Sequence, residues 1–538
     1  MKFIKNIVKD VLLISKATGT SNKKILIATS IVFSQLSGLT DIFLIGLFAF
    51  IIANQKTNIL VLDNIYIFFE QNRYFILVLI LFRFIFLFYQ SYIVKKIEFT
   101  VTQNMKEYIL SEIFEKKNYS TADAFFYTNE LSIHIGFFYS KITTFLNSFL
   151  QILVFTIYLM YSNIQVLTLF GLGLLILYFP IKQLLKISRN LVDKSYFANK
   201  NSMNEIERIV DNLFLIKILK KENYELKRFS KTVKELNQLL LRNHIFNLLN
   251  GFLPTFLTMF ILGLILVFFN SVVSLTLDFI GVTLKLFNSI SGLTGSISGI
   301  INSHVHMVKF KELEIHKVNK LKNNFKVLNN DVIRFQNVKF KYQNSSIFIF
   351  DDINAEFQKG KHTIITGENG TGKSTILGLA SGIFLPIEGT VSTFSKEYSY
   401  VSATPYIFRD TLLNNLIYGS EEKEYNEKDI IEKLSYLDTF KEENNYDLRK
   451  EISNKTLSSG QMQKIAFVRA ILLKPKIILL DESTSNLDIE TKTKIFNLLK
   501  EYKLTILNAT HDPENFSFAD HHIEIGIVDE KRLLNIIK

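Results

Sequence analysis

The sequence predicts a six-helix α-helical transmembrane domain with long cytoplasmic helical extensions, followed by a soluble α/β domain of the P-loop class. Three observations support this prediction. Six long apolar segments fill about the first 300 positions, a glycine-rich phosphate-binding motif stands at Gly367–Thr375, and an apolar strand ending in two acids follows about 100 residues later. The chain contains no cysteine, which excludes disulfides, thiolate metal sites and cysteine nucleophiles.

The apolar segments are each near or above the roughly 20 residues that a helix needs to span hydrocarbon. They lie at about Ile25–Ala53, Tyr74–Val94, Ile135–Tyr161, Val166–Leu185, Ile245–Asn270 and Val272–Ile301. The first is too long for the core of a signal peptide, so we interpret it as an uncleaved span. The predicted domains are a cytoplasmic N-terminal segment at 1–24, a transmembrane domain at 25–308, a linker at 309–330 and a nucleotide-binding domain at 331–538.

The distribution of Lys and Arg predicts the orientation of these spans. Met1–Lys24 carries six lysines and one aspartate, and the connection from Lys182 to Asn243 carries fourteen Lys/Arg against seven Asp/Glu. Positively charged connections stay in the cytoplasm, so we place the N-terminus, the long connections and the C-terminal domain there. Much of the net charge of +12 lies beside the apolar segments. Membrane topology therefore explains this charge, and no nucleic-acid partner is predicted.

Ionisable residues interrupt the apolar segments, among them Asp41, Arg83 and Lys285. Charges at such depth are costly, and they usually pair or line a polar cavity. The opposite signs and comparable depth of Asp41 and Arg83 favour an interhelical pair, with substrate contact as the alternative. Lys285 precedes the small and polar residues of Ser289–Asn302, which either pack closely against other helices or line a wet translocation path. In the second case Lys285 attracts an anionic group, so Arg83 and Lys285 are candidate substrate-path residues.

The glycine-rich motif follows the strand-like run Thr363–Thr366 and fits the pattern G-x-x-x-x-G-K-[ST] at every position. We expect its backbone N–H groups and the following helix to cradle phosphates. Lys373 is expected to reach the β- and γ-phosphates, and the Ser374 hydroxyl to bind Mg²⁺. The candidate nucleotide-binding residues of the motif are Gly367, Asn369, Gly370, Thr371, Gly372, Lys373, Ser374 and Thr375.

Apolar runs around the motif predict the strands of its sheet. Early strands are predicted at Val332–Phe335, Val338–Tyr342 and Ile353–Phe357. Ile477–Asp481 is predicted to be a buried strand that ends in two acids, Asp481 and Glu482. In P-loop proteins an Asp at this position supports Mg²⁺, and the adjacent Glu482 is well placed to polarise the attacking water.

Between these motifs, Thr456–Ala470 begins as a Ser/Gly turn that opens an amphipathic helix and presents further N–H groups suited to phosphate. Leu457–Gln461 resembles the signature of ATP-binding-cassette (ABC) ATPases. Six spans before one cassette resemble an ABC exporter half-transporter of bacterial type, similar to flippases of lipids or lipid-linked saccharides and to peptide or drug exporters. The resemblance implies an α/β P-loop ATP-binding cassette domain. It adds to the nucleotide-binding residues Leu457, Ser458, Ser459, Gly460 and Gln461.

The resemblance implies roles at further matching positions. Tyr342 stands where an aromatic ring stacks on adenine, with an ordinary strand tyrosine as the alternative. The loop that ends in Asp488 matches the loop that crosses to a partner cassette. His511 matches the histidine that contacts the γ-phosphate, and it joins Lys373 and Glu482 as an expected catalytic residue. The implied cofactors are ATP and Mg²⁺.

Two positions depart from the family pattern. The family normally has a glutamine after the Tyr400–Ser402 strand, where it helps to hold Mg²⁺ and water and senses the membrane domain, whereas this chain has Ala403. The signature position Ser459 is commonly glycine. We therefore expect ATP binding, with the rate and the coupling of hydrolysis altered by Ala403.

The ATP sites of the family are composite, so a single cassette implies a second half-transporter chain. A homodimer is favoured, and a heterodimer with a more typical partner is the alternative. The expected protein is a multi-pass ATP-driven exporter or flippase of the bacterial inner (cytoplasmic) membrane, in contact with membrane lipids and with an amphiphilic substrate. A lipid or lipid-linked saccharide is favoured over a peptide or drug. Two alternatives from other classes are a non-transporting ABC ATPase, which the six spans oppose, and a catalytically impaired membrane scaffold, which Glu482 opposes.

Overall fold

The structure is a computed structural model in which the chain forms two compact units, Met1–His316 and Lys317–Lys538. It describes residues 12, 15, 23–53, 60–115, 121–162, 164–268, 276–315, 324–328, 331–342, 347–419, 425–440, 446–502, 504–511, 513–516, 519–528 and 531–537. Almost all of the predicted N-terminal segment at 1–24 lies outside the described residues. The connection at 269–275 and the linker residues 316–323 also lie outside them.

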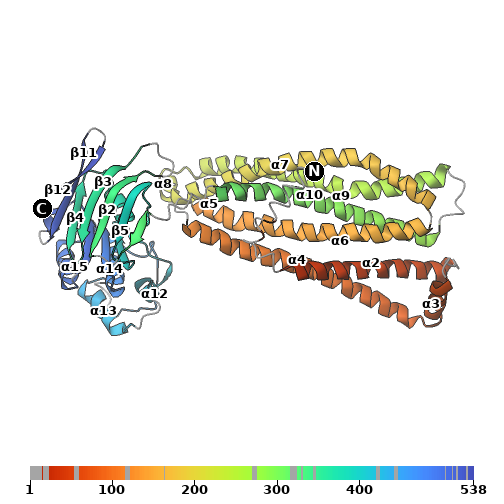
Figure 1. The fold of residues 1–538 in the computed structure, drawn as a ribbon, viewed down its shortest axis with the longest axis horizontal. Coiled ribbons are helices and arrows are strands. Elements are labelled where there is room, and N and C mark those ends of the chain that lie inside the picture. Colours follow the sequence, from red (N-terminus) through yellow and green to blue (C-terminus); the bar gives the residue numbers. More distant parts are fainter. Residues whose placement is uncertain are drawn as a thin grey trace. The chain divides into compact units, whose positions relative to one another are not determined.

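The first unit is built from six long helices that run alongside one another (Figure 1). They are α2 (Lys24–Ala53), α4 (Tyr74–Glu115), α6 (Ser132–Ser162), α7 (Ile164–Asp211), α9 (Glu222–Phe268) and α10 (Leu277–Ile315). Each predicted apolar segment falls largely within one of these helices, in the predicted order. In the described part of the chain, four helical stretches are long and apolar enough to cross a membrane. They are Lys24–Ala53 in α2, Tyr74–Phe114 in α4, Ala122–Ser162, which ends with α6, and Glu222–Ile261 in α9.

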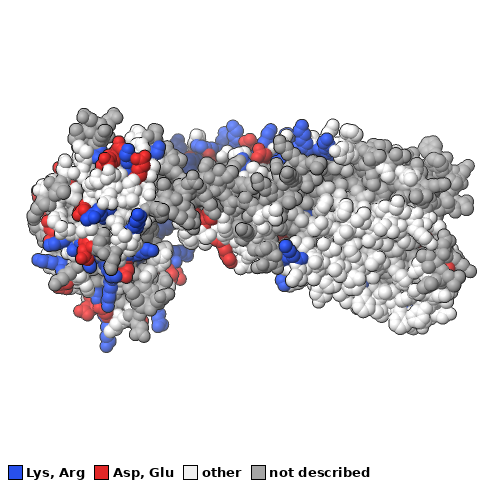
Figure 2. All heavy atoms as spheres, in the orientation of Figure 1, with Lys and Arg blue, Asp and Glu red and all other residues white. Residues whose placement is uncertain are grey.

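Several of these helices are longer than a bilayer requires. The 48 residues of α7 correspond to about 72 Å at 1.5 Å per residue, whereas the hydrocarbon layer is about 30 Å thick. Figure 2 shows few charged atoms on the surface over α2, α4 and α6, as expected for helices that face lipid. Long helices with an apolar stretch and a polar remainder match the predicted extensions.

The sequence pattern did not predict four short elements. They are α3 (Leu60–Gln71), α5 (Thr121–Phe126), a five-residue π-helical turn at Tyr127–Leu131, and α8 (Leu213–Ile218). Each is too short to show a clear period of its own beside the long helices. The sequence predicted only that the connections containing α5 and α8 would be long.

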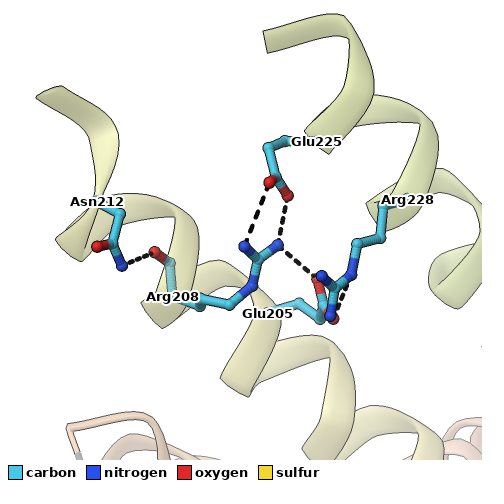
Figure 3. A network of polar contacts seen from close by, with 5 residues as sticks. All are labelled: Glu205, Arg208, Asn212, Glu225 and Arg228. Carbon is cyan, nitrogen blue, oxygen red and sulfur yellow. Dashed lines mark hydrogen bonds and ion pairs between the residues drawn. The ribbon is translucent and has the colours of Figure 1, made fainter. Parts of the chain in front are cut away.

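A network of alternating charges joins the end of α7 to the start of α9 around α8 (Figure 3). Arg208 donates to Glu225 through both terminal nitrogens, with Nη1 3.3 Å from Oε1, and to Glu205 Oε2 at 3.1 Å. Arg228 Nη2 donates to the other oxygen of Glu205 at 2.8 Å. A network of this kind holds its geometry better than an isolated surface pair. It therefore fixes the turn that carries α8, whose apolar side chains are mostly exposed.

The second unit is an α/β domain with two main sheets (Figure 1). Its strands are β1 (Phe325–Val327), β2 (Val332–Phe340), β3 (Phe350–Gln358), β4 (His362–Gly367), β5 (Glu388–Thr393), β6 (Tyr398–Ser402), β7 (Asp410–Thr411), β8 (Glu451–Ile452), β9 (Ile477–Asp481), β10 (Thr505–Ala509), β11 (His521–Val528) and β12 (Lys531–Ile536). The central sheet has the order β12-β11-β4-β10-β9-β6, and the second sheet has the order β1-β5-β2-β3. Strands β11, β4, β10, β9 and β6 are parallel, so the segments that follow β4 and β9 emerge at the same edge.

The helices of this unit cover both faces of the central sheet. They are α11 (Lys373–Ala380), α12 (Leu412–Ile417), α13 (Glu427–Tyr436), α14 (Ser459–Leu472) and α15 (Ile489–Glu501). Successive strand residues point to opposite faces, so Ile364 and Ile365 of β4 belong to different hydrophobic clusters. The cluster of Ile364 includes α12, α13, α14 and α15, and the cluster of Ile365 includes α11 and the second sheet.

The structure corrects the predicted early strands. Val332–Phe335 and Val338–Tyr342 are not separate, because one strand, β2, runs through both and ends at Phe340. The apparent interruption is an irregularity at Asn337, where φ is 50° and the pairing with β3 shifts register. Tyr342 consequently lies beyond the end of the strand.

Candidate nucleotide-binding site

The glycines of the P-loop hold backbone conformations that other residues rarely adopt. Gly367, Gly370 and Gly372 have φ of 144°, 80° and 108°. A Cβ on Gly367 would lie 2.7 Å from the carbonyl oxygen of Ile525, whereas one on Gly370 would meet nothing within 4 Å. The loop is therefore packed at its base and open at Gly370, which suits the close approach of a phosphate.

Lys373 begins α11, and its side chain is buried against the loop that precedes it. Its Nζ donates to the carbonyl oxygens of Gly367 at 2.9 Å and Glu368 at 3.1 Å. Burial lowers the pKa of Lys373, and the nearby charges of Glu482 and Asp481 oppose this change. We expect a bound phosphate to replace the carbonyl contacts with stronger charge-assisted hydrogen bonds.

Tyr342 lies beside the P-loop helix. Its Oη is 2.9 Å from Thr375 Oγ1, and its ring makes edge contacts with Phe340 and Phe384 at centroid distances of 5.3 and 5.6 Å. The side chain is 40% exposed. A ring that is held at its edge and partly exposed presents a face to solvent, which is the arrangement that adenine stacking requires. Two other predicted loop residues differ in exposure, since Asn369 is exposed and Thr371 is buried.

The carboxylate of Asp481 accepts hydrogen bonds from two hydroxyl groups. Ser374 Oγ donates to Asp481 Oδ1 at 2.9 Å, and Tyr400 Oη donates to Asp481 Oδ2 at 3.2 Å. Burial raises the pKa of Asp481, and these two hydrogen bonds oppose the rise. A hydroxyl beside a carboxylate suits Mg²⁺, which prefers oxygen ligands. Tyr400 was not among the predicted site residues, because only the pairing of β6 with β9 brings it here.

The three predicted catalytic side chains form one line of contacts. His511 Nε2 lies 3.0 Å from Glu482 Oε1 and 3.1 Å from Lys373 Nζ. Glu482 has φ of 49°, and its N–H donates to the carbonyl oxygen of Ala509 at 2.9 Å. A left-handed backbone at a non-glycine residue is uncommon and is often found at active sites. The turn after β9 thus holds Glu482 close to both other groups.

The signature turn opens α14 with a capping box. Ser458 Oγ accepts from the Gln461 N–H at 3.2 Å, and Gln461 Oε1 accepts from the Ser458 N–H at 2.9 Å. Leu457 packs against the core, and Ser459 and Gly460 form the first turn. A cavity of about 410 Å³ in front of this turn is lined by Asp438, Thr439, Phe440, Ser458, Gly460, Gln461, Lys464, Asn486, Leu487 and Asp488. These described lining residues include none of the P-loop, so the signature and the P-loop of one chain occupy different surfaces.

Asp488 has a local structural role besides lining that cavity. It is the N-cap of α15, where its Oδ1 accepts from the Thr491 N–H at 2.8 Å and its Oδ2 accepts from Thr491 Oγ1 at 3.0 Å. The hydrogen bond from the Thr491 backbone is the main cause of a lowered pKa of Asp488.

In the membrane unit, Asp41 pairs with both predicted cations. Arg83 Nε donates to Asp41 Oδ1 at 2.5 Å, and Lys285 Nζ donates to Asp41 Oδ2 at 3.1 Å. The interaction predicted between Asp41 and Arg83 is therefore present, and Lys285 joins it. Helices α2, α4 and α10 each contribute one charge. The side chains are 14%, 29% and 33% exposed for Asp41, Arg83 and Lys285.

The small and polar residues that follow Lys285 connect α10 to two neighbouring helices. Toward α9, Thr294 Oγ1 donates to the Asn250 carbonyl at 3.1 Å, and Ser298 Oγ donates to Asn247 Oδ1 at 2.6 Å. Toward α6, Ser296 Oγ lies 3.0 Å from Thr144 Oγ1, and Ser289 Oγ donates to Gln151 Oε1 at 3.2 Å. Hydrogen bonds in both directions support the packing interpretation of this segment.

Two sequence models of one family match most of the chain. The transmembrane region of ABC transporters matches residues 26–292, and the ABC transporter domain matches residues 350–485. An uncharacterized ABC transporter ATP-binding protein of Bacillus subtilis is 33% identical over 224 residues, which are 36% of this chain and 93% of that protein. The chain belongs to the ABC transporter family. This confirms the family that the sequence predicted.

Other comparisons concern the fused arrangement of an ABC transporter. A putative export ATP-binding/permease protein of Rickettsia prowazekii is 30% identical over 239 residues, 40% of this chain and 42% of that protein. ABC transporter B family member 17 of Arabidopsis thaliana is 35% identical over 31% of this chain, which is 15% of that protein. The chain therefore matches well under two thirds of these two relatives. The solved structure of a bacterial Atm1-family ABC exporter with ATP bound superposes with a TM-score of 0.77 at 15% identity, over 94% of each chain, which confirms the fold.

Hydrogen bonds to the backbone hold the segment around Ala403, where the sequence departs from the ABC transporter pattern. The carbonyl oxygen of Ala403 accepts from Gln463 Nε2 at 3.1 Å and from Asn486 Nδ2 at 3.2 Å. Gln463 Oε1 in turn accepts from the Asn486 N–H at 3.2 Å. Residue 403 is thus connected to the signature helix and to the loop before Asp488. The sequence did not identify Gln463, because its partners belong to two loops that are distant along the chain.

We expect Ala403→Gln to preserve or raise the ATPase rate, with any change within about tenfold. The new side chain restores the amide that the family normally has, and the existing hydrogen bonds use only the main-chain carbonyl of residue 403. Phosphate release at saturating ATP and Mg²⁺ measures the effect, with Thr404→Gln as a control at the neighbouring exposed position. A collapse of turnover in Ala403→Gln alone would show that the site has been rebuilt around alanine.

Proposed function

We propose that this chain is an ATP-driven exporter or flippase that couples ATP hydrolysis to the translocation of an amphiphilic substrate. A lipid or a lipid-linked saccharide is the favoured substrate, and a peptide or drug is the alternative. The long helices of the first unit and the nucleotide-site geometry of the second support a transporter over a soluble ABC ATPase. The proposed location is the bacterial inner membrane, with the N-terminus and the ATPase domain in the cytoplasm.

Within the proposed ATPase, each polar side chain of the site has a distinct task. Lys373 and the P-loop N–H groups bind the β- and γ-phosphates, and Ser374 and Asp481 hold Mg²⁺, which neutralises phosphate charge when bound. Glu482 polarises the attacking water, and His511 contacts the γ-phosphate. Hydrolysis in this arrangement depends mainly on positioning and electrostatic stabilisation.

The proposed active form is a dimer, because the signature and the P-loop of one chain lie on different surfaces. A second half-transporter chain supplies the missing half of each site. One chain carries Lys373, Glu482, Ser458 and His511, so two copies complete two sites and a homodimer is favoured. Ala403 is the observation that keeps a heterodimer with a more typical partner as the alternative. Closure of the dimer with ATP and its reset after hydrolysis would move the long helices between two states.

The substrate proposal rests on one observation, the unequal charges around Asp41. A single carboxylate faces two cations, Arg83 and Lys285, and among the described residues no other acid pairs with either cation. The group therefore has one more cation than anions, within helix segments that are largely apolar. The other acid of α10 in this region, Asp278, accepts from Tyr158 Oη at 2.7 Å. An anionic headgroup would balance this charge, whereas an uncharged or cationic drug would not. A lipid phosphate provides both the anion and the apolar body that suits the surrounding helices.

We expect Lys285→Gln to reduce transport of an anionic lipid by about tenfold or more, because one charge-assisted contact of about 1.5–3 kcal/mol is lost. Basal ATPase activity is expected to stay within about twofold, because Lys285 belongs to the membrane unit and the P-loop residues belong to the other unit. The protein is reconstituted in liposomes that contain fluorescent phosphatidylglycerol or phosphatidylcholine, and ATP-dependent movement between leaflets is measured. Co-purifying native lipids that stimulate the ATPase identify further substrates for the same assay.

Lys186→Gln is the matched control, because Lys186 is exposed on α7 and makes no contact with the Asp41 group. Equal transport by Lys285→Gln and the wild-type protein would contradict the anionic-substrate proposal and favour a purely structural role. Absence of ATP-dependent movement of either lipid, combined with transport of a labelled peptide or drug, would support the alternative substrate class.

A further inference from the structure

We propose that the Tyr400 hydroxyl is an outer-sphere ligand of the Mg²⁺ site and supplies the polar group that Ala403 lacks. This inference rests on the proposed Mg²⁺ site at Ser374 and Asp481. It assigns Tyr400 a positioning role, in which its oxygen orients the metal-binding carboxylate and a water bound to the metal.

Strand pairing places Tyr400 at the metal-binding edge of the sheet. Strand β6 is the parallel neighbour of β9, with Ser402 opposite Asp481 and Tyr400 opposite Leu479. From this position the long phenol side chain reaches Asp481 Oδ2 at 3.2 Å, while Ser374 Oγ occupies Oδ1 at 2.9 Å. Each oxygen of the carboxylate thus receives one hydroxyl hydrogen bond, which fixes the orientation of the carboxylate plane.

The hydrogen-bonding chemistry of a phenol suits an outer-sphere position. Tyr400 has one proton, which it donates to Asp481, and its oxygen keeps lone pairs that accept from a water. A metal-bound water is a strong donor, because the cation polarises its O–H bonds. Tyr400 therefore joins the carboxylate to the water shell of Mg²⁺ without being a direct ligand. Outer-sphere partners of this kind typically contribute 10–100-fold to metal affinity or activity.

Residue 403 cannot supply a polar group to the metal site, so this group has to come from another residue. The Ala403 carbonyl is already engaged by Gln463 and Asn486, and a methyl side chain provides neither a donor nor an acceptor. Tyr400 is three residues earlier on the same chain segment and directs its hydroxyl to Asp481. Tyr400 thus keeps a polar side chain of this strand in contact with Asp481, although residue 403 is alanine.

The test is Tyr400→Phe, which removes only the hydroxyl. Purified full-length protein in nanodiscs is titrated with Mn²⁺ in the presence of a non-hydrolysable ATP analogue, and bound Mn²⁺ is measured by electron paramagnetic resonance. We expect the Kd for Mn²⁺ to rise about tenfold. Binding of a fluorescent ATP analogue in EDTA is expected to stay within about twofold of the wild-type value, since the P-loop is intact, and it also shows that the variant folds.

Tyr398→Phe is the matched control from the same strand. The Tyr398 hydroxyl oxygen lies 2.8 Å from both the Ala380 carbonyl oxygen and Thr393 Oγ1. Neither partner belongs to the proposed metal site, so loss of this hydroxyl is expected to leave the Kd for Mn²⁺ unchanged. Ser374→Ala tests the underlying site. If Ser374→Ala weakens Mn²⁺ binding and Tyr400→Phe does not, the inference about Tyr400 is overturned and the Mg²⁺ site stands. If neither variant changes Mn²⁺ binding, the proposed site itself is wrong.

A double variant tests whether Tyr400 replaces the usual glutamine. Adding Ala403→Gln to Tyr400→Phe supplies a polar side chain at residue 403, where the family normally has glutamine. We therefore expect the Kd for Mn²⁺ of the double variant to recover to within about threefold of wild type. The same Ala403→Gln change in the wild-type background is expected to have little effect on the Kd. A double variant that stays as weak as Tyr400→Phe would overturn the replacement.

Discussion

Glu482→Gln is expected to lower the ATPase rate by at least about 100-fold, because a positioned general base typically contributes 10²–10⁴-fold. The structure holds Glu482 in a left-handed backbone conformation, with Oε1 3.0 Å from His511 Nε2. Glutamine has nearly the same shape and cannot accept a proton from water. ATP affinity is expected to stay within about threefold, because Lys373 and the P-loop remain intact. Phosphate release and binding of a fluorescent ATP analogue measure the two effects separately.

Glu368→Gln is the matched control for this variant. Glu368 is an exposed acid of the P-loop that accepts hydrogen bonds from Lys373 and Thr371 through its backbone carbonyl. The same acid-to-amide change there is expected to leave the ATPase rate nearly unchanged. A Glu482→Gln protein that retains more than about a tenth of the wild-type rate would show that another group polarises the water.

The sequence predicted the parts of the nucleotide site that are encoded in short segments. Each of these parts combines a short residue pattern with a local backbone conformation that is present in the structure. They are the P-loop, the strand end at Asp481 and Glu482, and the capped turn at Ser458. The contacts of Tyr400 and Gln463 were not predicted. They depend on the order of strands in the sheet and on loops that meet only after the chain has folded.

The membrane unit shows a similar division between what composition reveals and what packing decides. Hydropathy located the six long helices, because about 20 apolar residues are required to cross the bilayer. It did not locate α3 or α8, which are short elements at the ends of long helices. Asp41 and Arg83 were paired from their depth and sign. The addition of Lys285 depends on which faces of α2 and α10 meet, and the sequence alone does not specify that orientation.

Asp41→Asn is expected to destabilise the membrane unit by about 3 kcal/mol, the lower end of the 3–5 kcal/mol range for a broken buried pair, since the three side chains are partly exposed. The change removes the carboxylate that Arg83 and Lys285 share and leaves two cations beside each other. We expect the midpoint of thermal unfolding in detergent to fall by roughly 5–10 °C. Size-exclusion chromatography of heated samples measures this midpoint. Asp193→Asn, at an exposed acid of α7, is the matched control and is expected to change the midpoint little.

A second variant separates charge imbalance from the loss of the carboxylate itself. Asp41→Asn combined with Lys285→Met removes one cation, so it is expected to recover part of the lost stability compared with Asp41→Asn alone. If the double variant is less stable than Asp41→Asn, repulsion between the two cations is not the cause, and Lys285 stabilises the fold through its own packing. If stability recovers and anionic lipid transport does not, Lys285 balances Asp41 in the fold and also meets the substrate, which is the dual role that the unequal charges imply.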